Sequence, residues 1–329
     1  MRINEVRFKD ELGMIDWSKT RVVVTGGNGF LGRVVCRKLE ARGCRSVGVP
    51  THHDYDLSTE EGVRWMYADF EPEVVIHLAA EVGGIGANRE HPGRFFYKNM
   101  AMGLHLIEHA RRNRIKKFVQ AGTVCAYPKF TPVPFREENI WDGYPEETNA
   151  PYGVAKKSLF VMLDAYQREY GLKSAVVVPV NLYGPGDNFD PQSSHVIPAL
   201  IRKCCEARNR GEASMSCWGS GSASREFLYV DDAAEGILRA AEVMNEPLPI
   251  NLGTGREITI KNLVELIAKY TGFRGQIEWD PAKPDGQPRR CLDTSRAKEL
   301  LDWSAKMSFE EGLRQTIAWY EQSQLRRAA

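Results

Sequence analysis

The chain alternates short, β-branched apolar runs with longer stretches in which apolar residues recur at i, i+3 and i+4. Such alternation is typical of parallel βαβ units, in which a helix returns the chain to the start of the next strand. The run 21–25 (RVVVT) is apolar at consecutive positions, which indicates a strand covered by helices on both faces. Further strands are predicted at 46–50, 73–80, 116–122, 173–184 and 250–253. The helical periodicity predicts helices at 31–42, 93–113, 152–170, 196–209 and 260–271.

The periodic pattern changes after about Gly184 to polar loops that contain glycine and serine, with isolated helices. No repeat and no linker rich in Pro, Gly or Ser divides the chain, so we expect two interleaved domains. The predicted fold is α/β: a doubly wound parallel Rossmann sheet with a smaller mixed α/β substrate domain over the carboxyl ends of its strands. The expected boundaries are an N-terminal extension at 1–20, a dinucleotide-binding domain at 21–185 completed by about 228–255, and a substrate domain at 186–227 and 256–329.

Charge and cysteine usage narrow the possible partners. The 44 Lys and Arg residues nearly balance 43 Asp and Glu, which argues against nucleic acid or a membrane surface recognised by bulk charge. No apolar run approaches the roughly 18 residues of a membrane helix, and the first residues do not resemble a secretory signal. The seven cysteines form no CxxC pair and no zinc-type cluster, so we expect neither a disulfide framework nor a metal. These features predict a cytoplasmic protein.

A glycine-rich turn follows the first predicted strand and precedes a predicted helix. Gly26, Gly29 and Gly32 are spaced G-x-x-G-x-x-G, which lets the backbone approach a pyrophosphate and lets the helix pack on the strand. The helix N-terminus then faces the negative charge. A tight turn without a ligand is the alternative, and the flanking strand and helix favour the dinucleotide. The predicted contacts are Gly26, Asn28, Gly29, Phe30, Leu31 and Gly32.

The second predicted strand bears on the choice between NAD and NADP. An acidic residue at its end would select NAD through the ribose 2′-hydroxyl, but residues 48–53 (GVPTHH) contain none. His52, His53 or Arg33 can approach a 2′-phosphate instead, so we expect NADP(H). Asp56 is either a hydrogen-bond acceptor for the adenine amino group or a solvated turn carboxylate, and the spacing leaves both open.

A tyrosine and a lysine four residues apart supply the first candidate chemistry. Tyr152 and Lys156 share one face of a predicted helix. A nearby lysine, together with the positive nicotinamide ring of an oxidised cofactor, lowers the pKa of a phenol and lets it exchange a proton with a carbonyl oxygen. A plain surface pair is the alternative reading of this spacing. The glycine-rich turn and the hydroxyl of Thr123, at the end of a predicted strand, favour a reductase-type site.

Seven further segments resemble those of a known family. These segments are 77–85 (HLAAEVGGI), 125–129 (CAYPK), 181–189 (NLYGPGDNF), 194–200 (SHVIPAL), 218–221 (WGSG), 225–227 (REF) and 283–286 (KPDG). With them, the chain resembles the extended short-chain dehydrogenase/reductases that act on nucleotide sugars, and among these the GDP-L-fucose synthases. The similarity runs from about Arg21 to about Glu321.

The resemblance implies a bifunctional, NADP-dependent epimerase and oxidoreductase that works as a homodimer. Such an enzyme epimerises GDP-4-keto-6-deoxy-D-mannose at C3 and C5 and reduces C4 with NADPH. The resemblance assigns Thr123 (usually serine), Tyr152 and Lys156 to the ketone, and Cys125 and His195 to the epimerisation. Thiol and imidazole can exchange protons near neutral pH, as removal of a hydrogen α to a ketone requires. The cofactor contacts implied beyond the turn are Asp56, Leu57, Leu78, Ala79, Ala80, Tyr152, Lys156 and His195.

Without the resemblance, Cys125 reads more readily as a buried structural thiol and His195 as an ordinary histidine at a helix start. Asn28 also stands where some relatives carry an arginine for the 2′-phosphate. The dimer is expected to form through the helices at 93–113 and 152–170, whose outer faces should be apolar.

We expect the nucleotide part of the substrate to bind in a pocket lined by basic and aromatic side chains. Guanidinium groups bind a diphosphate through paired hydrogen bonds, and an indole ring can stack on or border the base. Each candidate can equally be a surface ion pair or a core aromatic. The candidates are Arg225, Arg290 and Arg202 or Lys203 for the diphosphate, Trp218 for the base and Asn181 for ordering the substrate.

Two other functions are also compatible with the sequence. One is a GDP-hexose epimerase of the GDP-mannose 3,5-epimerase type, which oxidises and re-reduces C4 without net redox change. The other is a non-catalytic protein that binds a sugar nucleotide or NADP and has lost the chemistry. Net consumption of NADPH separates the expected enzyme from both.

Overall fold

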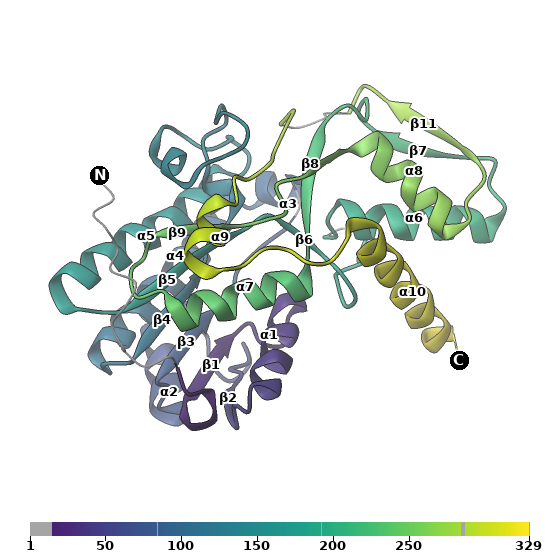
Figure 1. The fold of residues 1–329 in the computed structure, drawn as a ribbon. Coiled ribbons are helices and arrows are strands. Elements are labelled where there is room, and N and C mark those ends of the chain that lie inside the picture. The colour runs from purple at the N-terminus through teal and green to yellow at the C-terminus, as the bar shows by residue number, and fades with distance from the viewer. Residues whose placement is uncertain (1–14, 84, 192, 284–286, 329) are drawn as a thin grey trace.

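A computed structural model describes residues 15–83, 85–191, 193–283 and 287–328. Its largest feature is a six-stranded parallel sheet with the strand order β2-β1-β3-β4-β5-β9 (Figure 1). The order reverses between β1 and β3, and open sheets bind ligands outside the carboxyl ends of the strands at such a reversal. The strands are β1 (Arg21–Thr25), β2 (Ser46–Gly48), β3 (Val74–His77), β4 (Lys117–Ala121), β5 (Ser174–Pro179) and β9 (Pro249–Leu252).

Helices cover both faces of this sheet, as the doubly wound prediction requires. On one side α4 packs along α5 and against α2, and on the other α1 packs against α7. The consecutive valines of β1 are fully buried because helices lie above and below them. The helices are α1 (Phe30–Ala41), α2 (Glu60–Phe70), α3 (Ile85–Glu90), α4 (Pro92–Arg112), α5 (Ala150–Tyr170), α7 (Val230–Val243) and α9 (Ser295–Leu301), with 3-10 turns η1 (Trp17–Lys19), η2 (Val124–Ala126) and η3 (Glu137–Trp141).

A second, smaller lobe lies beyond the sheet, at the upper right of Figure 1. It contains the small sheet β10-β8-β6 and the pair β11-β7. Its own apolar core includes Tyr183, Ile201, Phe227, Ile267 and Leu313. Its elements are β6 (Asn181–Tyr183), α6 (Val196–Arg210), β7 (Ser214–Trp218), β8 (Ser224–Tyr229), β10 (Glu257–Thr259), α8 (Ile260–Thr271), β11 (Gln276–Asp280) and α10 (Phe309–Ala328).

The predicted single strand at 173–184 is wrong, because the structure divides it into β5 and β6. β5 stays in the main sheet, whereas β6 pairs with β8 in the second lobe. Val180 lies between them, and its N–H donates to the carbonyl of Leu252 at 3.0 Å. β5 is largely buried, whereas β6 is half-buried at Asn181 and Leu182. Which sheet each part joins depends on the distant partner strands, so the local sequence does not reveal the change of sheet.

The segment around α9 also differs from the expected domain boundaries. Leu292, Leu301 and Trp303 belong to the core of the main sheet, and α9 contacts α7 and β9. The sequence pattern placed this segment with the second domain, since an isolated short helix does not reveal which core it joins. No helix in the described ranges has the length and apolarity needed to span a membrane. The expected N-terminal extension lies mostly outside the described residues.

Candidate active site

The glycine-rich turn has the geometry that the sequence predicts. Gly26 has a φ of +71°, and the N–H of Gly29 donates to its carbonyl at 2.9 Å just before α1 begins. A Cβ on Gly32 would lie 2.1 Å from the oxygen of Gly26, and a Cβ on Gly26 would lie 2.9 Å from the nitrogen of Ala79. Only glycine fits at these two positions. Because the turn carries no side chain there, the first N–H groups of α1 remain accessible to an anion.

A cavity of about 370 Å³ opens beside this turn. Its size and its place at the strand-order reversal fit the adenosine part of a dinucleotide. Six predicted cofactor residues line it, namely Gly26, Asn28, Asp56, Leu57, Ala79 and Ala80. The sequence reasoning missed other lining residues, which include Pro50, Thr51, Tyr55, Ser58, Glu81, Arg94, Lys98 and Met102.

Two of the missed residues are cations. Lys98 Nζ donates to Ser58 Oγ at 2.6 Å and lies 3.5 Å from Asp56 Oδ2. Arg94 lies 2.6 Å from Glu81 Oε1. Their four-residue spacing at the start of a predicted helix places both on one face, a signal that was available in the sequence.

Asp56 lines the cavity and also accepts hydrogen bonds from a neighbouring residue. Its Oδ1 accepts from the N–H of Ser58 at 3.0 Å and from the Ser58 hydroxyl at 2.6 Å. These bonds and the nearby Lys98 lower the pKa of Asp56, so it is an acceptor at neutral pH. Of the three residues predicted near a 2′-phosphate, His52 lines the cavity, while the side chain of His53 is 95% exposed and lies against Asp54.

Thr123, Cys125 and Tyr152 come together where β4 ends and α5 begins. Thr123 caps η2, and its Oγ1 accepts from the N–H of Cys125 at 3.1 Å. Tyr152, in the first turn of α5, lies close enough to Thr123 and Cys125 for both to affect the pKa of its phenol. The next residue, Gly153, carries no side chain because a Cβ there would be 2.2 Å from the carbonyl oxygen of Cys125.

Burial shifts the pKa values of Tyr152 and Lys156 in opposite directions. Desolvation, and then Cys125, raise the pKa of Tyr152, and Thr123 opposes this only partly. Desolvation lowers the pKa of Lys156, which is 1% exposed, to about 8. The expected lowering of the phenol pKa by lysine is therefore wrong for the protein alone, because removal of water from the phenolate dominates.

His195 stands apart from this group. It occupies the N-cap position of α6, and its carbonyl accepts from the N–H of Ala199 at 3.0 Å. The side chain is accessible, while the surrounding protein lowers its pKa through partial desolvation. Within the described part of the chain, no hydrogen bond or ion pair joins His195 to Thr123, Cys125 or Tyr152.

The predicted nucleotide-end residues lie on the second lobe. Arg225 Nη1 donates to the carbonyls of Ser224 at 2.7 Å and Gln287 at 2.6 Å, and Arg290 Nη2 donates to Gln287 Oε1 at 2.9 Å. The structure therefore brings the two arginines together around Gln287. Trp218 is 69% exposed, with Lys283 Nζ 5.6 Å from the centre of its ring.

The remaining candidates are engaged in internal contacts. Lys203 donates to the carbonyl of Ser216. Arg202 pairs along α6 with Glu206 at 3.3 Å, while its Nε is buried without a partner. Asn181 Nδ2 donates to the carbonyl of Glu226 at 3.0 Å and so joins β6 to β8.

Comparison with known proteins identifies the family. Residues 22–253 match the model described as "NAD dependent epimerase/dehydratase family". The chain belongs to this family. It is 38% identical over 316 residues to the GDP-L-fucose synthase of Escherichia coli (strain K12), covering 93% of this chain and 98% of the relative. The probable GDP-L-fucose synthase 1 of Oryza sativa subsp. japonica is 39% identical over 301 residues, covering 91% of this chain and 92% of that one.

A solved structure of a related protein supports the assignment of this chain to the epimerase/dehydratase family. The GDP-L-fucose synthetase of Naegleria fowleri bound to NADP superimposes with a TM-score of 0.86 at 27% identity, covering 94% of each chain. The Rossmann-type architecture is therefore confirmed in a related solved structure.

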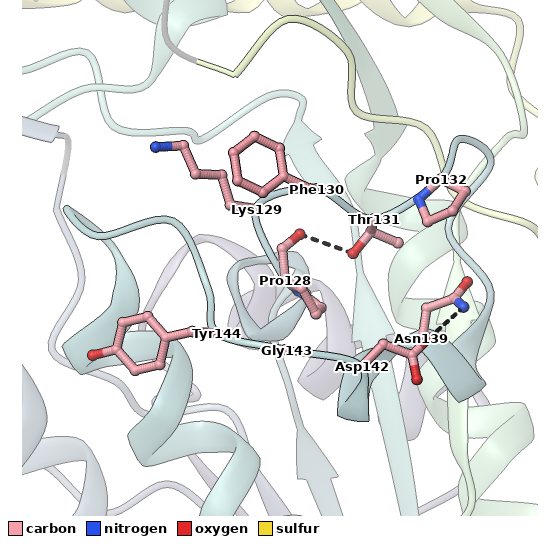
Figure 2. A pocket seen from close by; sticks show the side chains of 9 residues that line it. All are labelled: Pro128, Lys129, Phe130, Thr131, Pro132, Asn139, Asp142, Gly143 and Tyr144. Atoms are coloured by element: carbon pink, nitrogen blue, oxygen red, sulfur yellow. Dashed lines mark hydrogen bonds between the residues drawn. The ribbon is translucent and has the colours of Figure 1, made fainter.

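A second cavity, of about 160 Å³, lies in the loop that follows Cys125. Thr131 donates to the carbonyl of Pro128 at 2.8 Å, as the dashed line in Figure 2 marks, and Phe130 and Tyr144 also line this cavity. Phe130 is 87% exposed, so it is not a core residue. No feature of the sequence had marked this loop beyond the segment 125–129.

Proposed function

We propose that this protein is a GDP-L-fucose synthase: it epimerises GDP-4-keto-6-deoxy-D-mannose at C3 and C5 and reduces C4 with NADPH. The proposal rests mainly on the contact of Thr123 and Cys125 with Tyr152. This contact brings a hydroxyl, a thiol and a phenol close together. A reductase alone needs the phenol, whereas epimerisation α to a ketone needs a further acid or base. The names of relatives that match more than nine-tenths of the chain support the same function.

At the ketone, Tyr152 is the proton donor. Its raised pKa keeps the phenol protonated at neutral pH, so a proton is available to the C4 oxygen during reduction. Thr123 holds the same oxygen through its hydroxyl, and Lys156 supplies positive charge one helical turn away. Bound NADPH supplies the hydride.

At C3 and C5, Cys125 and His195 exchange the protons. Hydrogen-bond donors at the ketone oxygen stabilise the enolate that forms when an α-hydrogen leaves, and Thr123 and Tyr152 are placed for this. The lowered pKa of His195 keeps its imidazole neutral near pH 7, a form with both a proton to give and a lone pair to accept one. Each epimerisation then uses one group on each face of the sugar.

NADP(H) occupies the cavity beside the glycine-rich turn in this proposal. Gly26, Gly29 and Gly32 permit the approach of the diphosphate, and the open N–H groups of α1 bind it. Arg94 and Lys98 bring positive charge to the same cavity, together with His52. Arg94 already pairs with Glu81 and Lys98 with Asp56, so these pairs must open before the two cations can replace the arginine that is missing at Asn28. The other proposed contacts are Phe30, Leu31, Asp56, Leu57, Leu78, Ala79, Ala80, Tyr152, Lys156 and His195.

The GDP moiety is proposed to bind across the second lobe. Arg225 and Arg290 converge on Gln287, which suits two guanidinium groups that share one diphosphate. The exposed ring of Trp218 offers a stacking surface for the base. Lys203 and Asn181 remain proposed contacts for the diphosphate and the sugar. Arg202 is less suited to the diphosphate, because it already pairs with Glu206.

We also propose a cytoplasmic homodimer, formed by α4 and α5 of two copies. These helices pack side by side, and they expose apolar side chains outward. The exposed residues are Phe96, Tyr97 and Leu104 on α4 and Val161 and Tyr170 on α5. All seven cysteines are free, which suits a reducing compartment.

An assay with purified protein, NADPH and a panel of GDP- and dTDP-linked 4-keto sugars tests the function. We expect stoichiometric loss of NADPH absorbance and formation of GDP-L-fucose, both abolished in Tyr152→Phe. GDP-mannose is added to the panel as the C4-alcohol substrate, and its epimerisation without net NADPH loss would instead indicate the redox-neutral epimerase. A Tyr152→Phe variant with full activity would exclude this residue as the proton donor.

A further inference from the structure

A buried amide at the edge of the main sheet links three segments that are distant in sequence. Asn251, in the edge strand β9, is fully buried. Its backbone N–H donates to Glu137 Oε1 at 2.9 Å. Its side-chain Nδ2 donates to the carbonyls of Phe135 at 2.9 Å and Asp293 at 3.0 Å. The amide of Asn251 thus holds the loop after Cys125 and the segment before α9 against the sheet.

These contacts determine how the amide group is oriented. The carbonyls of Phe135 and Asp293 can only accept, so the NH₂ group must face them. The Oδ1 atom then faces Tyr127, whose hydroxyl donates to it at 2.6 Å across 124 residues of sequence. Burial raises the pKa of Tyr127, so the hydroxyl keeps the proton that it donates. All the hydrogen-bonding groups of the amide are used, as a buried polar group requires.

Tyr127 is joined directly to the turn that carries Cys125. The N–H of Tyr127 donates to the carbonyl of Val124 at 3.3 Å, which closes η2 around Cys125. The other end of the turn is held by Thr123, whose hydroxyl accepts from the N–H of Cys125. The buried hydroxyl of Tyr127 is therefore the anchor on the C-terminal side of Cys125, before the chain enters the loop of Figure 2.

We propose that Asn251 and Tyr127 are positioning residues that set the place of the Cys125 thiol beside Tyr152. Neither touches the reacting atoms; both act through the η2 turn. The carbonyl of Cys125 packs directly on Gly153, so a shift of the turn changes the place of the thiol relative to the neighbouring phenol. The catalytic consequence rests on the proposed function, in which Cys125 exchanges a proton with the sugar.

Tyr127→Phe is the main test, since it removes one hydroxyl and leaves the ring that packs 5.1 Å from Phe135. Tyr67→Phe is the matched control, because Tyr67 is equally buried, at 3% exposed, and donates one hydrogen bond to the carbonyl of Leu106 at 2.9 Å. Exchange of the C3 and C5 hydrogens of the 4-keto sugar with deuterated solvent is measured with NADP⁺ in place of NADPH, so that reduction cannot follow.

We expect Tyr127→Phe to slow the exchange about tenfold more than the control does, a smaller loss than the roughly hundredfold cost of a 1 Å misplacement. NADPH affinity in Tyr127→Phe should match that of the parent protein, because no residue of η2 or of the loop after it lines the cavity beside the glycine-rich turn. Asn251→Asp should have a similar effect, since it turns a carboxylate oxygen toward two carbonyls. Its effect should not add to that of Tyr127→Phe in the double variant. Equal exchange rates in Tyr127→Phe and Tyr67→Phe would overturn the proposal, as would full additivity.

A second readout does not depend on the proposed function. Cys36 and Cys125 are the partly exposed cysteines, and the other five are buried. In a Cys36→Ser background, the alkylation rate of Cys125 should change severalfold in Tyr127→Phe and stay unchanged in Tyr67→Phe. If Cys125→Ser retains full exchange, the proposed role of Cys125 fails, while the alkylation rate still decides whether Tyr127 positions the thiol. An unchanged alkylation rate in Tyr127→Phe would refute the positioning itself.

Discussion

Tyr152 and Lys156 show how one environment acts on two side chains. Withdrawal from water disfavours the charged form of both, so it raises the pKa of the phenol and lowers that of the ammonium. The phenol therefore remains a proton donor at neutral pH, whereas the lysine titrates near pH 8 in the free protein. The ionisation of Lys156 then sets the alkaline limit of the proposed reduction.

We expect kcat/KM for C4 reduction to fall as pH rises through about 8, because Lys156 is charged below its pKa and neutral above it. In Lys156→Arg, which keeps its charge, this alkaline decrease should disappear even if the overall rate is lower. The measurement is the initial rate of NADPH oxidation at low substrate across neutral and alkaline pH.

Lys117 provides the control for this prediction. Its pKa is also lowered to about 8 by burial, but it lies in β4 with its Nζ bonded to the carbonyl of Ala241, away from the site. Lys117→Arg should leave the alkaline decrease in place. A decrease that persists in Lys156→Arg would show that another group controls it.

At the scale of elements, the β1–α1 unit was predictable from the sequence because its signals are local. The strand, the turn and the helix start all depend on backbone conformation and on close approach within a few residues. Gly32 illustrates this, since the atom that excludes a Cβ belongs to Gly26 in the same turn. The division of 173–184 into β5 and β6 was not predictable, because it depends on which distant strands supply partners.

Gly32→Ala should weaken NADPH binding at least about tenfold, because the added Cβ would lie 2.1 Å from the oxygen of Gly26 and must displace the turn. Gly93→Ala is the control: it lies in α4 with no atom within 4 Å of the new Cβ. A fluorescence titration of NADPH measures both. Equal affinities of the two variants would contradict the assigned role of the turn.

At the scale of the whole molecule, the chain passes between β5 and β6 from the main sheet to the second lobe, each with its own apolar core, and the proposed site includes residues of both. Thr123, Cys125 and Tyr152 belong to the sheet side, whereas Arg225 and Trp218 belong to the second lobe. The outer faces of α4 and α5 remain without a partner within the described chain, although they carry five exposed large apolar side chains. This apolar surface is the physical basis of the proposed dimer.

Val161→Arg should convert the proposed dimer to a monomer, since it places a charge in an apolar interface at a residue that is 53% exposed. Leu325→Arg, on α10 and 72% exposed, changes charge equally outside the proposed interface and should leave the dimer intact. Sedimentation equilibrium distinguishes the two states. A monomeric parent protein, or a dimeric Val161→Arg variant, would exclude this interface.

Local patterns alone were sufficient for the class of fold, the phosphate-binding turn and the tyrosine–lysine pair. These features depend on residue spacing along one strand or one helix, and spacing can be read directly. The family resemblance supplied Cys125 and His195, which no local pattern distinguishes from a structural thiol and a helix-cap histidine. The contact of Cys125 with Thr123 and Tyr152 and the Tyr127–Asn251 bond emerged only from the folded chain. Each depends on the packing of elements that lie far apart in sequence, because burial and contact are properties of the assembled core.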